Sequence, residues 1–256
     1  MGKEHRLPER RQQILEAVQD AGQLSVAELS AQFDVSEVTI RQDLQALSEQ
    51  GFLLRTRGGA LSVNTMPEFS FDVRQHQHAA QKAKIGRAAA NLVSHGDTIF
   101  LDASTTVHAM IPHLKNFPEL TVITNSLKAA MSLLEAPQIQ IILPGGHLRR
   151  ESISLVGPTY AELLEEINVQ TGFFGARGVT VEEGLTDVNM NEVAMKRSMV
   201  ERCRRVVGVL DARKMGNVAT STFARLEQVD ILITDTNAPA DLVSQIRQQQ
   251  VEVILV

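Results

Sequence analysis

From residue 82 to its end, the chain alternates between helical and strand-like segments, and this alternation limits the possible folds more than any other feature. Short runs rich in Val, Ile, Leu and Thr separate segments whose apolar residues recur at helical spacing. The predicted strands are residues 98–101, 120–124, 139–143, 171–175, 205–210, 230–234 and 251–256. The predicted helices are residues 84–93, 105–114, 127–134, 160–167, 191–203 and 240–248. The pattern predicts an α/β domain with a mostly parallel sheet covered on both faces.

Polar or glycine-rich residues follow five of the predicted strands. Ligands of parallel α/β sheets bind beyond the carboxyl ends of the strands, so these positions are where a site is expected. The residues concerned are Asp102, Ser104, Thr105 and Thr106; Thr124, Asn125 and Ser126; Gly145, Gly146, Arg149 and Arg150; Gly175, Arg177 and Gly178; and Asp211, Arg213 and Lys214. Taken singly, helix capping explains each group better than ligand binding does. Together, their hydroxyls, helix-start N–H groups and cations indicate a site for a phosphorylated small molecule.

Near the N-terminus, residues 36–47 have the pattern of an amphipathic helix. Ser36 is predicted to cap this helix by accepting the backbone N–H of Thr39. The face expected to be buried comprises Ile40, Leu44 and Leu47, and the opposite face comprises Glu37, Val38, Arg41, Gln42 and Gln45. That opposite face carries a cation and two amides, which suit phosphates and base edges. Taken alone, the stretch is explained at least as well by an ordinary solvated helix.

The segments around this helix favour DNA binding. Residues 8–21 form a predicted first helix, and Ser25 with Glu28 matches a capping box that opens a short second helix. Two short helices joined by a tight turn form a helix-turn-helix, which presents its second helix to a DNA groove. Residues 52–61 follow as a hairpin with Gly58-Gly59 at its turn. The predicted DNA-contacting residues, including two arginines of this wing, are Ser36, Val38, Thr39, Arg41, Gln42, Gln45, Arg55 and Arg57.

Specific residue types recur throughout this N-terminal part. They are Arg10 or Arg11, Ile14 and Leu15, residues 36–44, and Arg57, Gly58, Gly59 and Ala60. This combination resembles the N-terminal signature of the DeoR-type family of bacterial transcription regulators. One difference is Gln42, because many members carry a second basic residue directly after the arginine. We also expect Asp43 to pair with Arg10 or Arg11 and so hold the first helix in place.

Further matching residues extend over most of the chain. They are Asp102, Thr105, Thr106, Thr124, Asn125, Gly145, Gly146, His147, Leu148, Arg149, Gly175, Gly178, Gly184, Leu185, Thr186, Asn191, Glu192, Lys196, Asp211 and Lys214. These residues resemble the effector domain of the same family, which is related to sugar-phosphate isomerases and coenzyme A transferases. The resemblance implies a regulator that usually acts as a repressor and assembles as a dimer or larger oligomer. Ser104 stands where the family usually has glycine, which adds a Cβ where backbone approaches ligand.

Residue chemistry suggests a role for each part of the predicted effector site. Thr105, Thr106 and nearby backbone N–H groups would hold the phosphate, with charge from Lys196 or Lys214. Sugar hydroxyls would donate to Asp102 and Glu192, and Asn125 would orient an oxygen substituent. An i, i+4 surface ion pair between Glu192 and Lys196 explains those two residues equally well. The predicted site residues are Asp102, Ser104, Thr105, Thr106, Asn125, Gly145, Gly146, Arg149, Gly175, Gly178, Glu192, Lys196 and Lys214.

We expect residues 1–62 to form a winged helix-turn-helix domain, residues 63–81 a linker, and residues 82–256 a sugar-phosphate-binding effector domain. The net charge of −5 is not that of a basic protein, so any DNA-binding cations must gather on one surface. The chain lacks an apolar run of about eighteen residues and has a polar start, so a cytoplasmic protein without a membrane partner is expected. His76 and His78 lack a neighbouring Cys or acidic cluster, and neither a metal nor a cofactor is expected.

These features predict a transcriptional regulator, a repressor of a carbohydrate-metabolism operon, whose affinity for double-stranded operator DNA is modulated by a phosphorylated sugar. The alternative is a sugar-phosphate isomerase-like enzyme fused to a DNA-binding domain, in which Asp102, Glu192 and Lys196 are acid and base groups. We expect no catalytic activity, because a shared fold does not carry activity with it. A third possibility is a second domain used only for homo-oligomer assembly, which predicts no stabilisation by any ligand.

Overall fold

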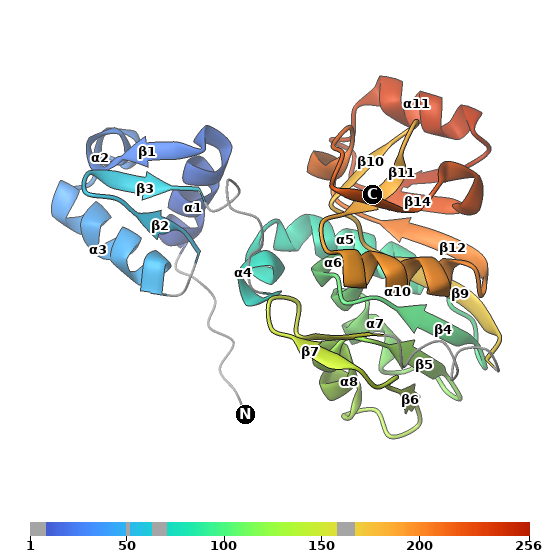
Figure 1. The fold of residues 1–256 in the computed structure, drawn as a ribbon. Coiled ribbons are helices and arrows are strands. Elements are labelled where there is room, and N and C mark those ends of the chain that lie inside the picture. The colour runs from blue at the N-terminus through green and yellow to red at the C-terminus, as the bar shows by residue number, and fades with distance from the viewer. Residues whose placement is uncertain (1–8, 50–51, 63–70, 158–166) are drawn as a thin grey trace. The chain divides into compact units, whose positions relative to one another are not determined.

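The structure is a computed structural model that describes residues 9–49, 52–62, 71–157 and 167–256. It divides into two compact units, Met1–Val73 and Arg74–Val256 (Figure 1). None of the helices in these ranges is long and apolar enough to cross a membrane.

The first unit contains three helices and a small antiparallel sheet. The helices are α1 (Glu9–Ala21), α2 (Val26–Phe33) and α3 (Glu37–Glu49), and the strands are β1 (Gln23–Ser25), β2 (Leu54–Arg55) and β3 (Gly59–Leu61). The strands pair in the order β1-β3-β2. Ile40, Leu44 and Leu47 of α3 are fully buried in one core with residues of α1 and α2, as their spacing predicted. The helix-turn-helix and its hairpin wing are therefore present as expected.

Local capping explains where the helices of this unit begin. The Thr39 N–H donates to Ser36 Oγ over 3.2 Å, and Ser25 with Glu28 forms the predicted capping box before α2. Strand β1 was not predicted, because it is only three residues long and its last residue is also the cap of α2. Both glycines were expected in the wing turn, but Gly59 begins β3. A Cβ at Gly59 would lie 2.1 Å from the Leu24 carbonyl oxygen of β1, so only glycine fits there.

The second unit is built on a seven-stranded parallel sheet. Its strands are β4 (Thr98–Leu101), β5 (Thr121–Thr124), β6 (Gln140–Ile142), β9 (Val169–Phe174), β12 (Cys203–Val209), β14 (Ile231–Thr234) and β15 (Glu252–Leu255), in the order β15-β14-β12-β9-β4-β5-β6. Each overlaps a predicted strand, which confirms the predicted fold class. From β4 the chain adds β5 and β6 on one side, then returns to place β9 on the other. The topological switch point, where such sheets bind ligands, therefore lies between β4 and β9.

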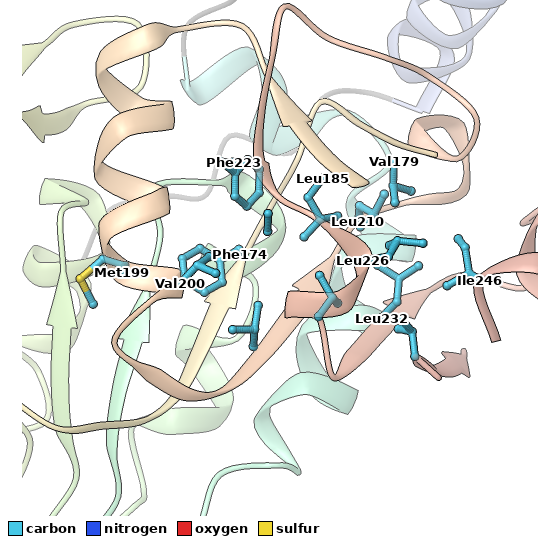
Figure 2. Close-up of a cluster of buried hydrophobic side chains, with 14 of the residues drawn as sticks. Phe174, Val179, Leu185, Met199, Val200, Leu210, Phe223, Leu226, Leu232 and Ile246 are labelled. Atoms are coloured by element: carbon cyan, nitrogen blue, oxygen red, sulfur yellow. The ribbon is translucent and has the colours of Figure 1, made fainter. Parts of the chain in front are cut away.

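Helices and a second sheet cover the two faces of the parallel sheet. The helices are α5 (Ala79–Ala90), α6 (Thr105–His108), α7 (Ile111–Leu114), α8 (Leu127–Leu133), α10 (Met190–Val200) and α11 (Ala240–Gln248). Successive strand residues alternate between the faces. Phe100 and Phe174 belong to the apolar cluster that includes residues of α10 and α11, in which Figure 2 labels Phe174, whereas Ile99 and Phe173 pack with α5 to α8. Both faces of the inner strands β4, β5, β9 and β14 are thus largely buried, which explains their nearly continuous apolar sequences.

Several elements of the second unit differ from the prediction. Those not predicted are the hairpin of β7 (His147–Arg149) and β8 (Ser154–Val156), the antiparallel sheet of β10 (Gly178–Thr180), β11 (Gly184–Asp187) and β13 (Ser221–Ala224), and the 3-10 helices η2 (Ala212–Lys214) and η3 (Leu226–Gln228). These elements are too short to show a clear periodicity. The helix expected at 105–114 is two short helices, and Pro112 stands in the first turn of the second. The stretch expected to be a linker contains α4 (Phe71–His76) and the start of α5. The helix expected at 160–167 lies almost entirely outside the described residues.

Candidate functional site

The exposed face of α3 carries the predicted DNA-contacting residues. Arg41, Gln42 and Gln45 are exposed, and Val38 has 61% of its surface accessible. Arg41 forms an ion pair with Glu37 one turn earlier on the same helix. Ser36 and Thr39, at the start of the helix, share a hydrogen bond of 2.9 Å between their hydroxyls. An exposed valine beside a cation and two amides offers both apolar and hydrogen-bonding contacts to base edges.

The wing lies against the same helix. Arg55 of β2 donates from Nη1 to Gln45 Oε1 of α3 over 2.8 Å, so wing and helix present their polar groups together. Arg57 stands exposed in the turn between β2 and β3. Two cations beside a recognition helix suit contacts to backbone phosphate, which orient a protein on DNA without reading its sequence.

Asp43 fixes α1 to α3, as the sequence predicted. Its carboxylate is 2% exposed and accepts Nε–H of Arg10 over 2.7 Å and Nε–H of Arg11 over 2.8 Å. Burial opposes the charged form, but the two guanidinium groups outweigh it and hold the pKa of Asp43 below its usual value. Both arginines therefore have a role in the fold of this unit.

In the second unit, the predicted effector residues meet at the switch point of the sheet. Asp102 follows β4 and Gly175 follows β9, and the Gly175 N–H donates to Asp102 Oδ2 over 2.9 Å. The Ser104 N–H donates to Asp102 Oδ1 over 2.8 Å, and Lys196 Nζ lies 2.9 Å from Oδ2. Asp102 is 1% exposed. Both of its oxygens are occupied within the protein, so it holds two strand ends together rather than facing a ligand.

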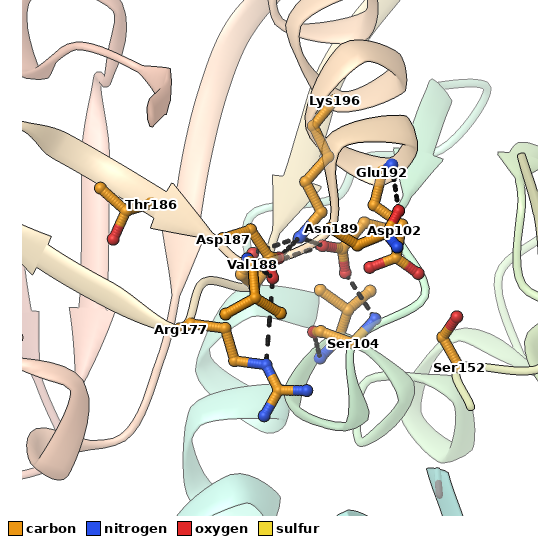
Figure 3. A network of polar contacts seen from close by, with 12 residues as sticks. Asp102, Ser104, Ser152, Arg177, Thr186, Asp187, Val188, Asn189, Glu192 and Lys196 are labelled. Atoms are coloured by element: carbon orange, nitrogen blue, oxygen red, sulfur yellow. Dashed lines mark hydrogen bonds and ion pairs between the residues drawn. The ribbon is translucent and has the colours of Figure 1, made fainter. Parts of the chain in front are cut away.

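Lys196 of α10 is the centre of this network (Figure 3). Its Nζ lies 2.7 Å from Asp187 Oδ2, donates to the Gly175 carbonyl oxygen over 2.8 Å, and stands 4.8 Å from the centre of the Phe223 ring. Burial alone would lower the pKa of Lys196, but Asp102 and Asp187 raise it above its usual value. The amine therefore stays protonated and forms ion pairs with two buried carboxylates.

Glu192 belongs to a second ion pair beside this network. Its Oε1 lies 2.9 Å from Arg149 Nη1 and accepts a hydrogen bond of 3.1 Å from the Ser154 hydroxyl. Glu192 is 8% exposed and Lys196 is 4% exposed, so these two residues do not form the surface ion pair considered above. Burial would raise the pKa of Glu192, but Lys196 and Arg149 are among the groups that bring it below its usual value.

The loop after β4 places three predicted residues at the start of α6. Ser104 caps this helix by accepting the Val107 N–H over 3.0 Å, while Thr105 and Thr106 are buried in its first turn. A Cβ at Gly175 would lie 2.3 Å from the Ser104 Cβ. Gly175 is therefore required so that the end of β9 can pack against this loop.

The remaining predicted residues lie around these loops. Asn125 is fully buried after β5, and its Oδ1 accepts no hydrogen bond from any described residue. Gly146 has a φ of +139° and adjoins the Val156 backbone, and a Cβ at Gly178 would lie 2.0 Å from the Asn217 carbonyl oxygen. Gly145 precedes Gly146 and is exposed. The glycines permit close backbone packing, and the buried acceptor of Asn125 suits a hydroxyl donor.

Four cations gather beside the network, namely Arg74, Lys82, Arg177 and Lys214. Of these, only Lys214 was among the predicted site residues. Arg177 Nε lies 3.9 Å from Asp187 Oδ1, so this cation already has an acidic partner in the network. Burial is the main cause that lowers the pKa of Arg74 to about 10, of Lys82 to about 7 and of Lys214 to about 8, and repulsion between the cations adds to it. Sequence reasoning missed Arg74 and Lys82 because both lie at or next to the stretch taken as a linker. It noted Arg177 at a strand end but did not include it among the site residues, because a lone arginine after a strand is a weak signal.

Comparison with known proteins agrees with this two-part organisation. A model of the DeoR-like helix-turn-helix domain matches residues 10–66, and a model of the DeoR C-terminal sensor domain matches residues 77–236. The chain belongs to the DeoR family of transcriptional regulators. It is thus a DNA-binding regulator and not an enzyme, and the second unit corresponds to the family's sensor domain.

Similar DeoR-family proteins match over nearly their whole length. The HTH-type transcriptional regulator GolR of Listeria innocua is 40% identical over 89% of this chain and 90% of its own. The putative aga operon transcriptional repressor of Escherichia coli O157:H7 is 33% identical over 97% and 93% of the two chains, and the glycerol-3-phosphate regulon repressor of E. coli K12 is 30% identical over 94% and 96%. A D-ribose-5-phosphate isomerase structure aligns with 54% of each chain at 15% identity and a TM-score of 0.41. That similarity says nothing about activity.

Proposed function

We propose that this DeoR-family regulator is a repressor of a carbohydrate-metabolism operon, and that a phosphorylated sugar in its sensor domain changes its affinity for operator DNA. The observation that carries the proposal is the gathering of Arg74, Lys82, Arg177 and Lys214 beside the switch point. Burial and repulsion between the cations lower the pKa of Arg74, Lys82 and Lys214, so this part of the site favours an additional negative charge. A phosphate dianion would supply that charge.

The site then divides into a supporting part and a ligand-facing part. Asp102, Asp187 and Lys196 form ion pairs that hold the strand ends in place, and Arg177 adds a second cation beside Asp187. The phosphate would lie among the cations and the first turn of α6, where Thr105 contributes a hydroxyl and backbone N–H groups lack helical partners. The unsatisfied Oδ1 of Asn125 would accept a sugar hydroxyl.

The names of similar proteins support the same assignment. One relative is named for the glycerol-3-phosphate regulon and another for the aga operon, and both are described as repressors. We also propose that this protein acts in the cytoplasm, as a homo-oligomer whose symmetry matches a two-fold operator. We also propose residues 1–62, 63–81 and 82–256 as its functional parts, with the first helix of the linker contributing Arg74 to the site.

The test combines melting curves with operator binding. A panel of pentose, hexose and polyol phosphates is compared with the unphosphorylated parents at equal concentration. A ligand at 100 times its Kd adds about 2.7 kcal/mol to the stability of the native state, a rise of roughly 5–10 °C in Tm for a domain of this size. We expect one phosphorylated sugar to produce this rise and to change the operator gel shift. Equal stabilisation by a free sugar, or no response to any sugar phosphate, would contradict the proposal.

A further inference from the structure

Arg41 lies on the exposed face of α3 next to an acidic side chain of the same helix. Its Nη2 lies 2.5 Å from Oε2 of Glu37, one turn earlier. Glu37 stands in the first turn of α3, where the positive end of the helix dipole stabilises a carboxylate. The arginine side chain is 52% exposed and the glutamate 47%. An exposed pair of this spacing adds little to stability, so its effect is expected in DNA binding rather than in folding.

The arginine of the wing has a partner of a different kind. Arg55 donates from Nη1 to the amide oxygen of Gln45, and an amide carries no charge. Arg55 with its amide is therefore a cation at the surface, whereas Arg41 with Glu37 is neutral as a pair. The phosphates of double-stranded DNA attract net positive charge. The wing therefore suits a phosphate better than the ion pair on α3 does.

We infer that Glu37 is a specificity-determining residue, which positions the guanidinium of Arg41 on a guanine in the major groove and keeps it from the phosphates. A guanidinium has five N–H donors in one plane, so it can bond to Glu37 and still offer two N–H groups to O6 and N7 of guanine. The carboxylate repels phosphates and lowers the sequence-independent attraction of this face to DNA. It also restricts the rotamers of Arg41 before binding, so less side-chain entropy is lost on the operator. The inference holds whichever ligand the sensor domain binds.

The test is the base preference of the full chain. Duplexes that the protein binds are selected from a random library and sequenced, which gives the preference at each position of the operator. We expect the wild type to prefer guanine at one position by about 5- to 150-fold through Arg41. Arg41→Ala should lose this preference and keep the others. Glu37→Gln should reduce the same preference at least about threefold, although Arg41 is present. Arg41→Lys should reduce it too, because lysine has the charge without the planar fork.

Glu16→Gln is the matched control, because Glu16 is an exposed glutamate of α1 whose carboxylate accepts a hydrogen bond from Gln12, one turn earlier. This control removes the same charge from the same unit. Affinity for a non-operator duplex is measured by fluorescence anisotropy at several salt concentrations. The slope of log affinity against log salt should steepen by up to about 0.9 in Glu37→Gln and not in the control, because Arg41 can then neutralise a phosphate. Melting curves show that each variant is folded.

The double variant of Glu37→Gln with Arg41→Ala separates positioning from direct contact. If Glu37 acts through Arg41, the base preferences of the double variant equal those of Arg41→Ala alone. A further change in the double variant would mean that Glu37 contacts a base itself, and would overturn the inference. Equal base preferences in Glu37→Gln and Glu16→Gln would also overturn it, as would a uniform loss of affinity with a shallower salt slope in Arg41→Ala, which would place Arg41 on a phosphate.

Discussion

Replacing Lys196 with methionine tests the buried network more directly than any other change. Methionine keeps much of the length and the apolar stem of the side chain but removes its charge. The ammonium group lies 2.9 Å from an oxygen of Asp102 and 2.7 Å from one of Asp187, and all three side chains are buried. The substitution therefore removes the cation nearest to two buried carboxylates and leaves Asp187 with only the more distant Arg177, at 3.9 Å.

The expected loss of stability is large. Removing one partner of a buried ion pair costs about 3–5 kcal/mol, because the remaining charge has lost both its partner and its water. Asp102 still accepts hydrogen bonds from two backbone N–H groups, which stabilise its charge. Its contribution to the loss should therefore lie at the lower end of that range. For a domain of roughly 150–250 residues, this loss corresponds to a fall in Tm of about 6–20 °C.

Urea unfolding of the full chain measures this loss, with Lys84→Met as the control for the same substitution at an exposed site. The midpoint should fall while the slope m is retained, since the amount of surface exposed on unfolding does not change. A double-mutant cycle of Lys196→Met with Asp187→Asn should give an interaction energy of about 1–3 kcal/mol.

The pH dependence of stability tests whether buried charge causes this loss. In the wild type Asp187 has a lowered pKa, so it adds stability above its unfolded pKa and loses it in strong acid. In Lys196→Met, burial without the ammonium group raises the pKa of Asp187 above its unfolded value, so this variant gains stability as the pH falls. The difference in the free energy of unfolding between the variant and the wild type should therefore narrow as the pH falls from about 7 to about 5. A loss below about 1 kcal/mol, or one independent of pH, would refute the buried-charge reasoning.

Three further variants test other parts of the molecule. If Arg41 contacts a base, Arg41→Ala should weaken operator binding by about 1–3 kcal/mol and relax specificity at one position. If Arg41 contacts a phosphate, the substitution should instead reduce the salt dependence of operator affinity. Unchanged affinity in fluorescence anisotropy would show that Arg41 is not part of the DNA-contacting face of α3. Thr105→Val should abolish the response to a sugar phosphate in gel shifts and leave operator binding intact, whereas loss of operator binding with a normal melting curve would indicate a role in assembly. Asp102→Asn should lower the Tm, because the amide nitrogen of asparagine would replace one of the two oxygens that accept backbone N–H groups in the wild type. An unchanged Tm would contradict the structural role of Asp102.

Much of the fold could be predicted because its signals are local. The N-cap of Ser36 and the buried stripe of Ile40, Leu44 and Leu47 lie within a few turns of one helix. The strands of the parallel sheet could be recognised in the sequence as apolar runs, because strands buried on both faces contain few polar residues. The pairing of Asp43 with Arg10 and Arg11 also followed from a recognisable signature.

The candidate site was only partly predictable. Residues at strand ends could be selected by rule, but their roles depended on partners far along the chain. Asp102 was expected to face a sugar, whereas its oxygens bind the N–H groups of Ser104 and Gly175 and the amine of Lys196. Arg74 and Lys82 had no local signal, because nothing in the sequence around them indicates that they lie close to Lys214.

The sequence by itself thus determined the helix-turn-helix, the strand segments and the polar character of the strand ends, because periodicity, capping and turn residues act over a few residues. Only the tertiary structure decided that β9 returns beside β4 and so placed the switch point between Asp102 and Gly175. It also decided which charges neutralise one another and which cations remain in excess. The physical reason is that pairing energies and pKa values depend on distance and burial, and both are set by contacts between residues remote in the chain.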